Sequence, residues 1–197
     1  RLPVFAPRLS TGLINPNPDV QVSHQEEATA TIDGDNGMGH IVASRSMELA
    51  MSLAKTFGVA AVAAKNSNDF GMAGYYARMA LEEQMLAIVV SNDAPVMVPT
   101  YGKVPMLGSN PLAIAIPGAE DATPFVLDMA TTATSRHRLE DAVRSGETIP
   151  PGLALDKSGN RTEDPKAALE AMALLPLGAS SEAGSHKGYG LAIAIDI

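Results

Sequence analysis

The sequence of 197 residues contains no cysteine and no tryptophan, and only 4% of its residues are aromatic. The lack of cysteine excludes disulfides, thiolate catalysis and cysteine-ligated metals. The 14 Lys and Arg residues are outnumbered by 22 Asp and Glu residues, which argues against a broad nucleic-acid interface. No apolar run approaches the ~20 residues that span a bilayer. We therefore expect a cytoplasmic protein with neither a nucleic-acid nor a membrane partner.

Two common nucleotide-binding loops are also missing. No GxGxxG follows a predicted strand, because Gly34, Gly37 and Gly39 are wrongly spaced, and no GxxxxGK[ST] loop occurs. The histidines show no i, i+4 pairing and no clustering typical of metal ligands, so a surface or structural role is favoured for each (His24, His40, His137 and His186). We predict neither a standard Rossmann cofactor site nor a metal site.

Aliphatic residues dominate what is present, since 46% of the chain is apolar and 18% is charged. This composition is typical of a globular α/β protein. Residues 1–27 contain four prolines and are predicted to be extended or looping chain rather than helix. Strands are predicted at 28–33, 59–64, 86–91, 112–116 and 125–128, and helices at 39–57, 72–83, 135–145 and 166–173. Turns are predicted over most of 148–165, and residues 188–197 fit either a strand or a helix.

The spacing of elements within residues 59–91 predicts a right-handed parallel crossover. The loops after Ala64 and after Ser91 would then open on the same edge of a sheet. The strand pair within 112–128 indicates that the sheet is mixed rather than fully parallel.

Three aspartates end or follow predicted strands, namely Asp69, Asp93 and Asp128. One interpretation is that each caps a helix or starts a turn, which explains most aspartates at such positions. The other is a shared functional rim. If Asp69 and Asp93 approach closely, their combined charge favours a bound proton and gives a proton carrier at neutral pH.

Two further segments suit an anionic ligand. The run from Asp128 to Thr132 leaves a strand and enters a hydroxyl-bearing turn, which can hold a phosphate or a ribose. Its alternative role is to lead into a helix whose N-cap is Thr134 or Ser135. Lys187 stands in a glycine-rich turn, where it either binds a phosphate or carboxylate or is a solvated loop lysine.

Ordered motifs along nearly the whole chain resemble those of one enzyme family. They are NSNDFGxxGYYA at 66–77, NDxPxxxP at 92–99, GSNP at 108–111, PFVLDMAT at 124–131, the GxxIP-to-DP run at 146–165, LLPLG at 174–178 and KGYGL at 187–191. They resemble the type-2 malate/L-lactate dehydrogenase family, which also contains ureidoglycolate, sulfolactate and diketogulonate reductase-like enzymes.

This resemblance implies a three-layer α/β/α fold with a mixed sheet, a non-Rossmann NAD(P)-binding fold that usually forms a homodimer. It implies metal-independent hydride transfer between NAD or NADP and a small 2-oxo or 2-hydroxy acid such as malate or lactate. Arg1 is expected to grip the substrate carboxylate. The implied cofactor-binding residues are Asp93, Asp128, Met129, Ala130, Thr131, Thr132, His186 and Lys187. The family's N-terminal helices and C-terminal segment are missing, so we expect residues 1–197 to be a fragment of one such domain.

Two positions depart from the family pattern. Asp69 stands where the family has a histidine that acts as acid or base, and Asp93 stands where it often has serine. Three hypotheses follow. An upstream histidine donates the proton and Asp69 orients it, or Asp69 and Asp93 form a proton-carrying pair, or the protein is a catalytically silent, cofactor-binding paralogue.

Overall fold

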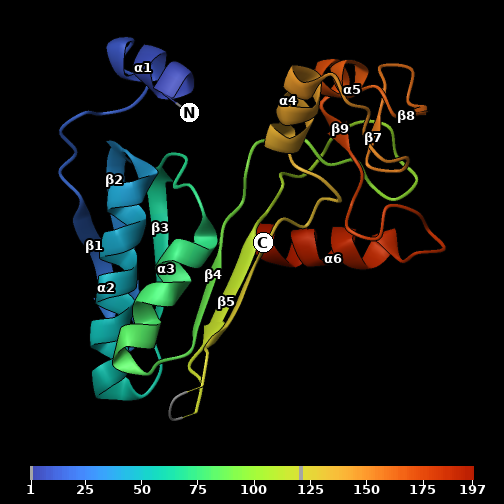
Figure 1. Ribbon diagram of the computed structural model, residues 1–197. Helices are drawn as coiled ribbons and strands as arrows, with labels where there is room; N and C mark the ends of the chain where they lie inside the picture. The colour runs from blue at the N-terminus through green and yellow to red at the C-terminus, as the bar shows by residue number, and fades with distance from the viewer. Residues whose placement is uncertain (1, 120–121) are drawn as a thin grey trace. The chain divides into compact units, whose positions relative to one another are not determined.

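The computed structural model of the protein describes residues 2–119 and 122–197 and has a mixed α/β architecture. Figure 1 shows the elements in chain order. The helices are α1 (Leu2–Ser10), α2 (Gly39–Phe57), α3 (Ala73–Met79), the 3₁₀ turn η1 (Ala80–Glu83), α4 (Arg136–Ser145), α5 (Pro165–Ala171) and α6 (Ser185–Asp196). The strands are β1 (Gln21–Glu26), β2 (Thr29–Gly37), β3 (Ala61–Ser67), β4 (Ala87–Val90), β5 (Leu112–Ile116), β6 (Phe125–Met129), β7 (Ala154–Leu155), β8 (Arg161–Thr162) and β9 (Ala173–Leu174).

The chain divides into two compact units. Unit 1 comprises Arg1–Ile88 and Ile114–Val126, and unit 2 comprises Val89–Ala113 and Leu127–Ile197. The strands of the sheet ordered β4-β5-β6 contain the points at which the chain passes from one unit to the other.

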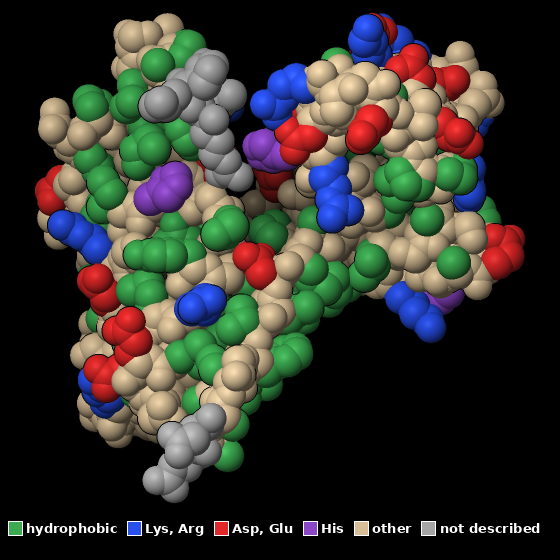
Figure 2. All heavy atoms as spheres, in the orientation of Figure 1, with side chains coloured by type: hydrophobic (Ala, Val, Ile, Leu, Met, Phe, Trp, Pro, Cys, Tyr) green, Lys and Arg blue, Asp and Glu red, His purple; other side chains and the backbone are tan. Residues whose placement is uncertain are grey.

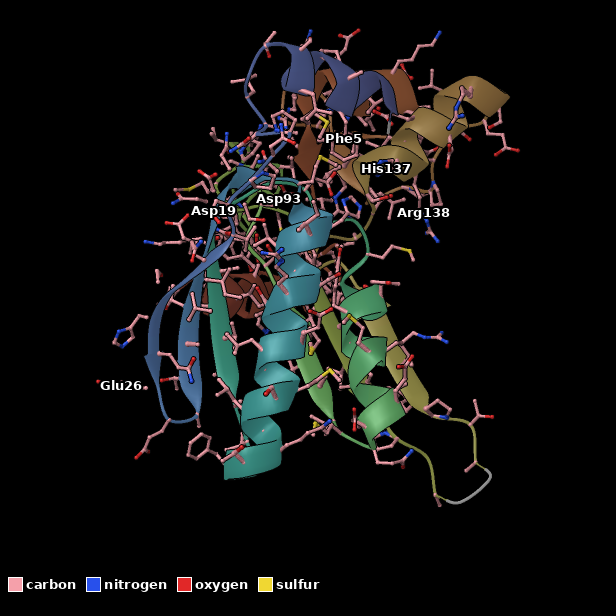
Figure 3. The ribbon with its side chains drawn as sticks, turned by 90° about the vertical axis from the view of Figure 1, so that its left-hand side faces the viewer. Phe5, Asp19, Glu26, Asp93, His137 and Arg138 are labelled. Atoms are coloured by element: carbon pink, nitrogen blue, oxygen red, sulfur yellow. The ribbon has the colours of Figure 1, made fainter. Side chains whose placement is uncertain are left out.

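Unit 1 is built on a mixed sheet ordered β1-β2-β3, in which β1 is antiparallel and β3 is parallel to β2. The helix α2 lies against one face of this sheet, and α3 lies beside α2 (Figures 1 and 3). Alternating residues of β2, among them Ala30 and Ile32, are buried, and Val42 of α2 is fully buried. This alternation is the pattern expected of a strand with one covered face.

The helix α1 contradicts the expectation of extended or looping chain over residues 1–27, whereas the extended strand β1 agrees with it. Pro3 lies in the first turn of α1, where a missing N–H costs little, and Pro7 removes only one bond of a short helix. Phe5 is largely buried, and its ring meets His40 of α2 edge-on at 6.2 Å. Tertiary packing therefore supports a helix that the prolines argued against.

The parallel crossover occurs one element earlier than predicted. It joins β2 to β3 through α2, whereas β3 and β4 belong to different sheets. The expected crossover across residues 59–91 was wrong because β4 pairs with β5 instead of with β3. The strand β3 also begins and ends two or three residues later than predicted, since its register places Ala61 opposite Thr29 and Lys65 opposite Asp33.

Unit 2 contains the small antiparallel sheet ordered β8-β7-β9 together with α4, α5 and α6. Leu139 of α4, Ala154 of β7, Ala168 of α5 and Leu174 of β9 form its core. The Ser135 hydroxyl accepts a hydrogen bond from the Arg138 N–H and caps α4. This confirms Ser135 as the N-cap. Asp164 caps α5 in the same way, with Pro165 at its first turn.

The last apolar run is a helix, which decides between the two forms predicted for it. Ser185, Gly188 and Ala192 of α6 are buried at helical spacing on one face. A Cβ on Gly188 would lie 2.4 Å from the Leu177 carbonyl oxygen, so only glycine fits there. The close approach of α6 to residue 177 therefore depends on this glycine.

The surfaces of the two units differ in character. Figure 2 shows hydrophobic side chains among the charged ones over α2 and α3, where Ile41, Phe57, Met72 and Tyr75 are exposed. Charged side chains gather over α4 and α5. Within the described residues, none of the helices has the length and apolar character required to cross a membrane.

Candidate functional site

The loop that carries Asp69 is fastened to the junction between β2 and α2. The Asn68 side-chain amide donates to the carbonyl oxygens of Asn36 and Gly37, both at 3.0 Å. A Cβ on Gly39, the first residue of α2, would lie only 2.1 Å from the Asn68 carbonyl oxygen. The loop after β3 is thus held against the start of α2, with its backbone in a defined position.

Asp69 itself is exposed, and its Oδ1 accepts a hydrogen bond of 2.9 Å from the Gly71 N–H. The Tyr76 hydroxyl, on α3, donates to the Phe70 carbonyl oxygen. The Phe70 and Tyr76 rings also pack together with centroids 5.5 Å apart. The turn therefore presents a carboxylate to solvent on a backbone that α3 anchors, which suits a group that exchanges protons with a substrate.

A second polar cluster lies beside β2 and β3, around Asp33 and Asp35. The Asn66 side-chain amide donates to both Asp33 oxygens at 3.0 Å, and Lys65 Nζ lies 3.3 Å from Asp33. The Asn66 amide, helped by the Asp35 N–H and Lys65, lowers the pKa of Asp33 below its ordinary value. Asp35 accepts from Asn15 and from the Asp19 N–H. These carboxylates are engaged in holding the strand ends, and no metal-binding group of three His, Cys, Asp or Glu occurs in residues 2–119 and 122–197.

In unit 2, the segment after β6 is bound into the protein by its threonines. Thr131 is fully buried and donates twice to the Ser109 carbonyl oxygen, from its N–H at 2.9 Å and its hydroxyl at 3.0 Å. The Thr132 hydroxyl donates to the Thr134 carbonyl oxygen at 2.7 Å. Both hydroxyl protons are therefore used internally. Asp128 remains exposed and Met129 and Ala130 half-buried, so these three residues are the accessible part of the segment.

The first turn of α6 is a second element of this region. Its N-cap, Gly184, offers no side-chain cap, and the exposed side chains of His186 and Lys187 follow. The buried hydroxyl of Ser185 has no hydrogen-bond partner among the described residues. The N–H groups of Ser185 and Lys187 donate to the carbonyl oxygens of Ser180 and Gly184. A helix N-terminus without a side-chain cap, an orphan hydroxyl and a lysine fits a phosphate group chemically.

Residue 177 joins these two elements. The Leu177 N–H donates to the Thr131 carbonyl oxygen at 2.8 Å, while Gly188 of α6 packs against the Leu177 backbone. The segment after β6 and the first turn of α6 thus both contact the backbone of Leu177.

Asp93 enters the same network through two residues that sequence reasoning did not select. The Ser109 hydroxyl donates to Asp93 Oδ2 at 3.0 Å, and the Asp93 N–H donates to Asn110 Oδ1 at 3.2 Å. Asn110 is fully buried and donates to the Ala192 carbonyl oxygen at 2.9 Å and to Asp196 at 3.2 Å. We refer to Asp93, Ser109, Asn110, Thr131 and Leu177, with the first turn of α6, as the unit 2 lattice. The GSNP motif at 108–111 was the available signal for Ser109 and Asn110.

The predicted site residues are therefore distributed unevenly. All eight expected cofactor residues lie in the lattice or in the segment after β6, and all eight belong to unit 2. Asp69 lies in unit 1. Arg1 lies outside the described residues. His137, on α4 (Figure 3), is exposed and takes no part in the lattice.

Comparison with known proteins shows the family to which the chain belongs. The sequence profile described as malate/L-lactate dehydrogenase matches residues 1–197. An L-sulfolactate dehydrogenase from Methanocaldococcus jannaschii is 44% identical over 197 residues, which are 100% of this chain and 55% of the relative. A malate dehydrogenase from Pyrococcus horikoshii is 43% identical over 198 residues, covering 100% of this chain and 54% of that protein. The chain thus spans about half the length of the curated relatives it matches.

The fold agrees as well as the sequence. The crystal structure of malate dehydrogenase from Entamoeba histolytica superimposes with a TM-score of 0.93 at 38% identity, covering 98% of this chain and 55% of that one. The resemblance read from the ordered motifs is confirmed, and the chain belongs to the malate/L-lactate dehydrogenase family.

Proposed function

We propose that the protein transfers a hydride between NAD(P)H and a small 2-oxo acid, forming the corresponding 2-hydroxy acid. Family membership supports this reaction class, and the relatives above are named for malate and sulfolactate, both 2-hydroxy acids. The observation that carries the proposal is the unit 2 lattice, because it joins the uncapped, lysine-bearing start of α6 to the segment after β6.

In this proposal, different parts of the lattice bind different parts of the dinucleotide. Lys187 holds the phosphates at the start of α6, with His186 beside it. Asp128, Met129 and Ala130 line the accessible side of the segment after β6, while the buried Thr131 and Thr132 fix that segment in place. When bound, the reduced nicotinamide supplies the hydride to the carbonyl carbon of the substrate.

The carbonyl oxygen must gain a proton in the same reaction. Asp69 is the group we assign to this proton, either as the donor or by orienting another donor, because it is exposed on an anchored turn. Arg1 binds the substrate carboxylate in this proposal, as a guanidinium does with two parallel hydrogen bonds. We further infer a three-layer, non-Rossmann arrangement for the whole protein, a homodimer, a cytoplasmic location and no need for a metal.

The test is turnover by the full-length protein. NADH or NADPH is mixed with a panel of 2-oxo acids that includes oxaloacetate, pyruvate and sulfopyruvate, and oxidation of the cofactor is followed by absorbance. We expect oxidation that depends on one of the acids, with formation of one 2-hydroxy acid per NAD(P)H consumed. Cofactor binding without turnover on any acid would contradict this proposal and support a catalytically silent paralogue.

The phosphate role of Lys187 has its own test. Lys187→Ala should weaken cofactor binding by about 10- to 100-fold, the range for one hydrogen bond to a charged group. The matched control is Lys157→Ala, which removes an exposed lysine of the same unit that pairs with Glu170. Unchanged affinity in Lys187→Ala would refute the assignment of the phosphate site.

A further inference from the structure

The side chain of Asp93 is held in one orientation although it is exposed. Its Oδ2 accepts from the Ser109 hydroxyl at 3.0 Å, and its Oδ1 accepts from the Ala94 N–H at 2.7 Å. A carboxylate offers about four acceptor positions, so lone pairs on both oxygens remain available to solvent or to a ligand.

The backbone of Asp93 is also held in place by hydrogen bonding. Its N–H donates to Asn110, whose fully buried amide also bonds to two residues of α6. An acceptor that is already immobilised loses little conformational entropy when it binds a donor. Asp93 is therefore prepared to accept hydrogen bonds from a ligand.

The charge of Asp93 is not neutralised by its neighbours. The hydrogen-bond donors to its carboxylate are one alcohol and one backbone amide, and none of the ion pairs found in the described part of the chain includes it. A fixed negative charge attracts hydroxyl donors and repels an additional phosphate. The lysine-bearing start of α6, in the same lattice, offers the opposite environment.

A fixed, unneutralised carboxylate is a group that can distinguish the two nicotinamide cofactors. They differ at one position, where NAD has a ribose 2′-hydroxyl and NADP has a phosphate, and a carboxylate that accepts from that hydroxyl selects NAD. Building on the proposed function, we propose that Asp93 is a specificity-determining residue that accepts hydrogen bonds from the ribose hydroxyls and makes the protein prefer NADH to NADPH.

The experiment measures the dissociation constants of NADH and NADPH by fluorescence titration, for the wild type, Asp93→Ser and Asp93→Asn in the full-length protein. The wild type should bind NADH about 10- to 100-fold more tightly, the range for a hydrogen bond to a charged group. Both variants should reduce the preference for NADH over NADPH, because NADPH should bind more tightly and NADH more weakly than in the wild type. The wild-type ratio should also shrink as salt is raised, because salt screens repulsion between exposed charges.

A matched control is Asp156→Ser in the same unit. Asp156 likewise accepts backbone N–H bonds in a turn, from Ser158 and Asn160, and lies outside the lattice. Its replacement should leave the NADH:NADPH ratio unchanged. The Asp93→Asn variant keeps an acceptor for Ala94 and guards against misfolding of the turn.

The possible outcomes separate the two proposals. A wild type that prefers NADPH, or an NADH:NADPH ratio that is the same in the wild type and both Asp93 variants, overturns the specificity role while leaving the dehydrogenase function standing. Binding of neither cofactor overturns the proposed function and the specificity role together.

Discussion

Unit 1 and unit 2 hold their functional segments by different means. In unit 1 the turn that carries Asp69 is held by hydrogen bonds from the half-buried Asn68 side chain and from the Tyr76 hydroxyl. In unit 2 the corresponding hydrogen bonds are made by Asn110 and Thr131, which are fully buried. The Asp69 turn lies at a strand end near the surface, whereas Asn110 and Thr131 of the unit 2 lattice lie in the interior.

This difference has an energetic consequence. Leaving a buried polar group unsatisfied costs about 1–3 kcal/mol, because it loses its partner and cannot reach water. Exposed groups exchange one partner for water at little cost. We therefore expect substitutions in the lattice to affect stability and cofactor affinity together, and substitutions in the Asp69 turn to affect turnover with stability nearly unchanged.

The largest effect is expected for Asp69→Asn. Asparagine keeps the acceptor for the Gly71 N–H but cannot transfer a proton, so turnover should fall by about 10²–10⁴-fold. Cofactor affinity should remain within about twofold of the wild type because the lattice is untouched. Steady-state kinetics and cofactor titration measure the two quantities. Retention of wild-type turnover would remove Asp69 from the proton path.

A smaller loss of turnover should follow from Gly39→Ala. The new Cβ would lie 2.1 Å from the Asn68 carbonyl oxygen, so the Asp69 turn must move. Misplacement of a reacting group by about 1 Å can reduce a rate by about 100-fold, and we expect a loss between about 10- and 100-fold. Ser52→Ala, at an exposed position of the same helix, is the control. Equal kinetics in the two variants would show that the position of this turn does not matter.

Alanine substitutions at Gly188 and Gly190 of α6 compare a change that disturbs the lattice with one that does not. A Cβ at residue 188 would clash with Leu177, whereas nothing lies within 4 Å of a Cβ at residue 190. Gly188→Ala should lower the free energy of unfolding by about 1–3 kcal/mol and weaken cofactor binding. Gly190→Ala should instead raise stability by roughly 0.5–1 kcal/mol, since alanine favours helix. Denaturant unfolding distinguishes them, and similar losses in both would contradict the packing argument.

The smallest effect concerns pH and Asp33 in unit 1. Its pKa is lowered in the folded protein, chiefly by the Asn66 amide, so its ionised form stabilises the fold at neutral pH. This stabilisation is complete at pH values above the pKa of an unfolded aspartate, about 4. It is lost as the pH falls further and passes the lowered pKa of Asp33 in the folded protein. Asn66→Ala should be slightly less stable than the wild type at neutral pH, and the difference should shrink in acid. Thermal unfolding across pH tests this, with Asn17→Ala as the control. A difference that is constant with pH would exclude Asp33 as its origin.

Several elements could be predicted because their signals are local. The helix α2 shows one apolar face and ends at Gly58, which adopts the left-handed conformation typical of a C-cap. The strand β5 was predicted with its observed bounds from a short apolar run. By contrast, all residues of β1 are exposed, so no hydrophobic pattern marked it, and its pairing with β2 alone makes it a strand.

The site divides in the same way. Asp69, Asp93, the DMATT segment and Lys187 were selected by their motifs, which depend on chemistry and chain order. Ser109 and Asn110 were not, because their role consists of bonds to residues as distant as Ala192 and Asp196. The partners in such bonds leave no local pattern in the sequence, and only the GSNP motif pointed to Ser109 and Asn110.

The sequence by itself determined the family, the reaction class to be tested and the residue types at each loop, because these are carried by motifs of a few adjacent residues. Only the tertiary structure decided that α1 is a helix despite two prolines, that the crossover joins β2 to β3, and that the last apolar run is a helix packed on Leu177. It also decided which cofactor residues share one network. The physical reason is that packing and long-range hydrogen bonds depend on contacts between residues far apart in the chain, which local propensity does not encode.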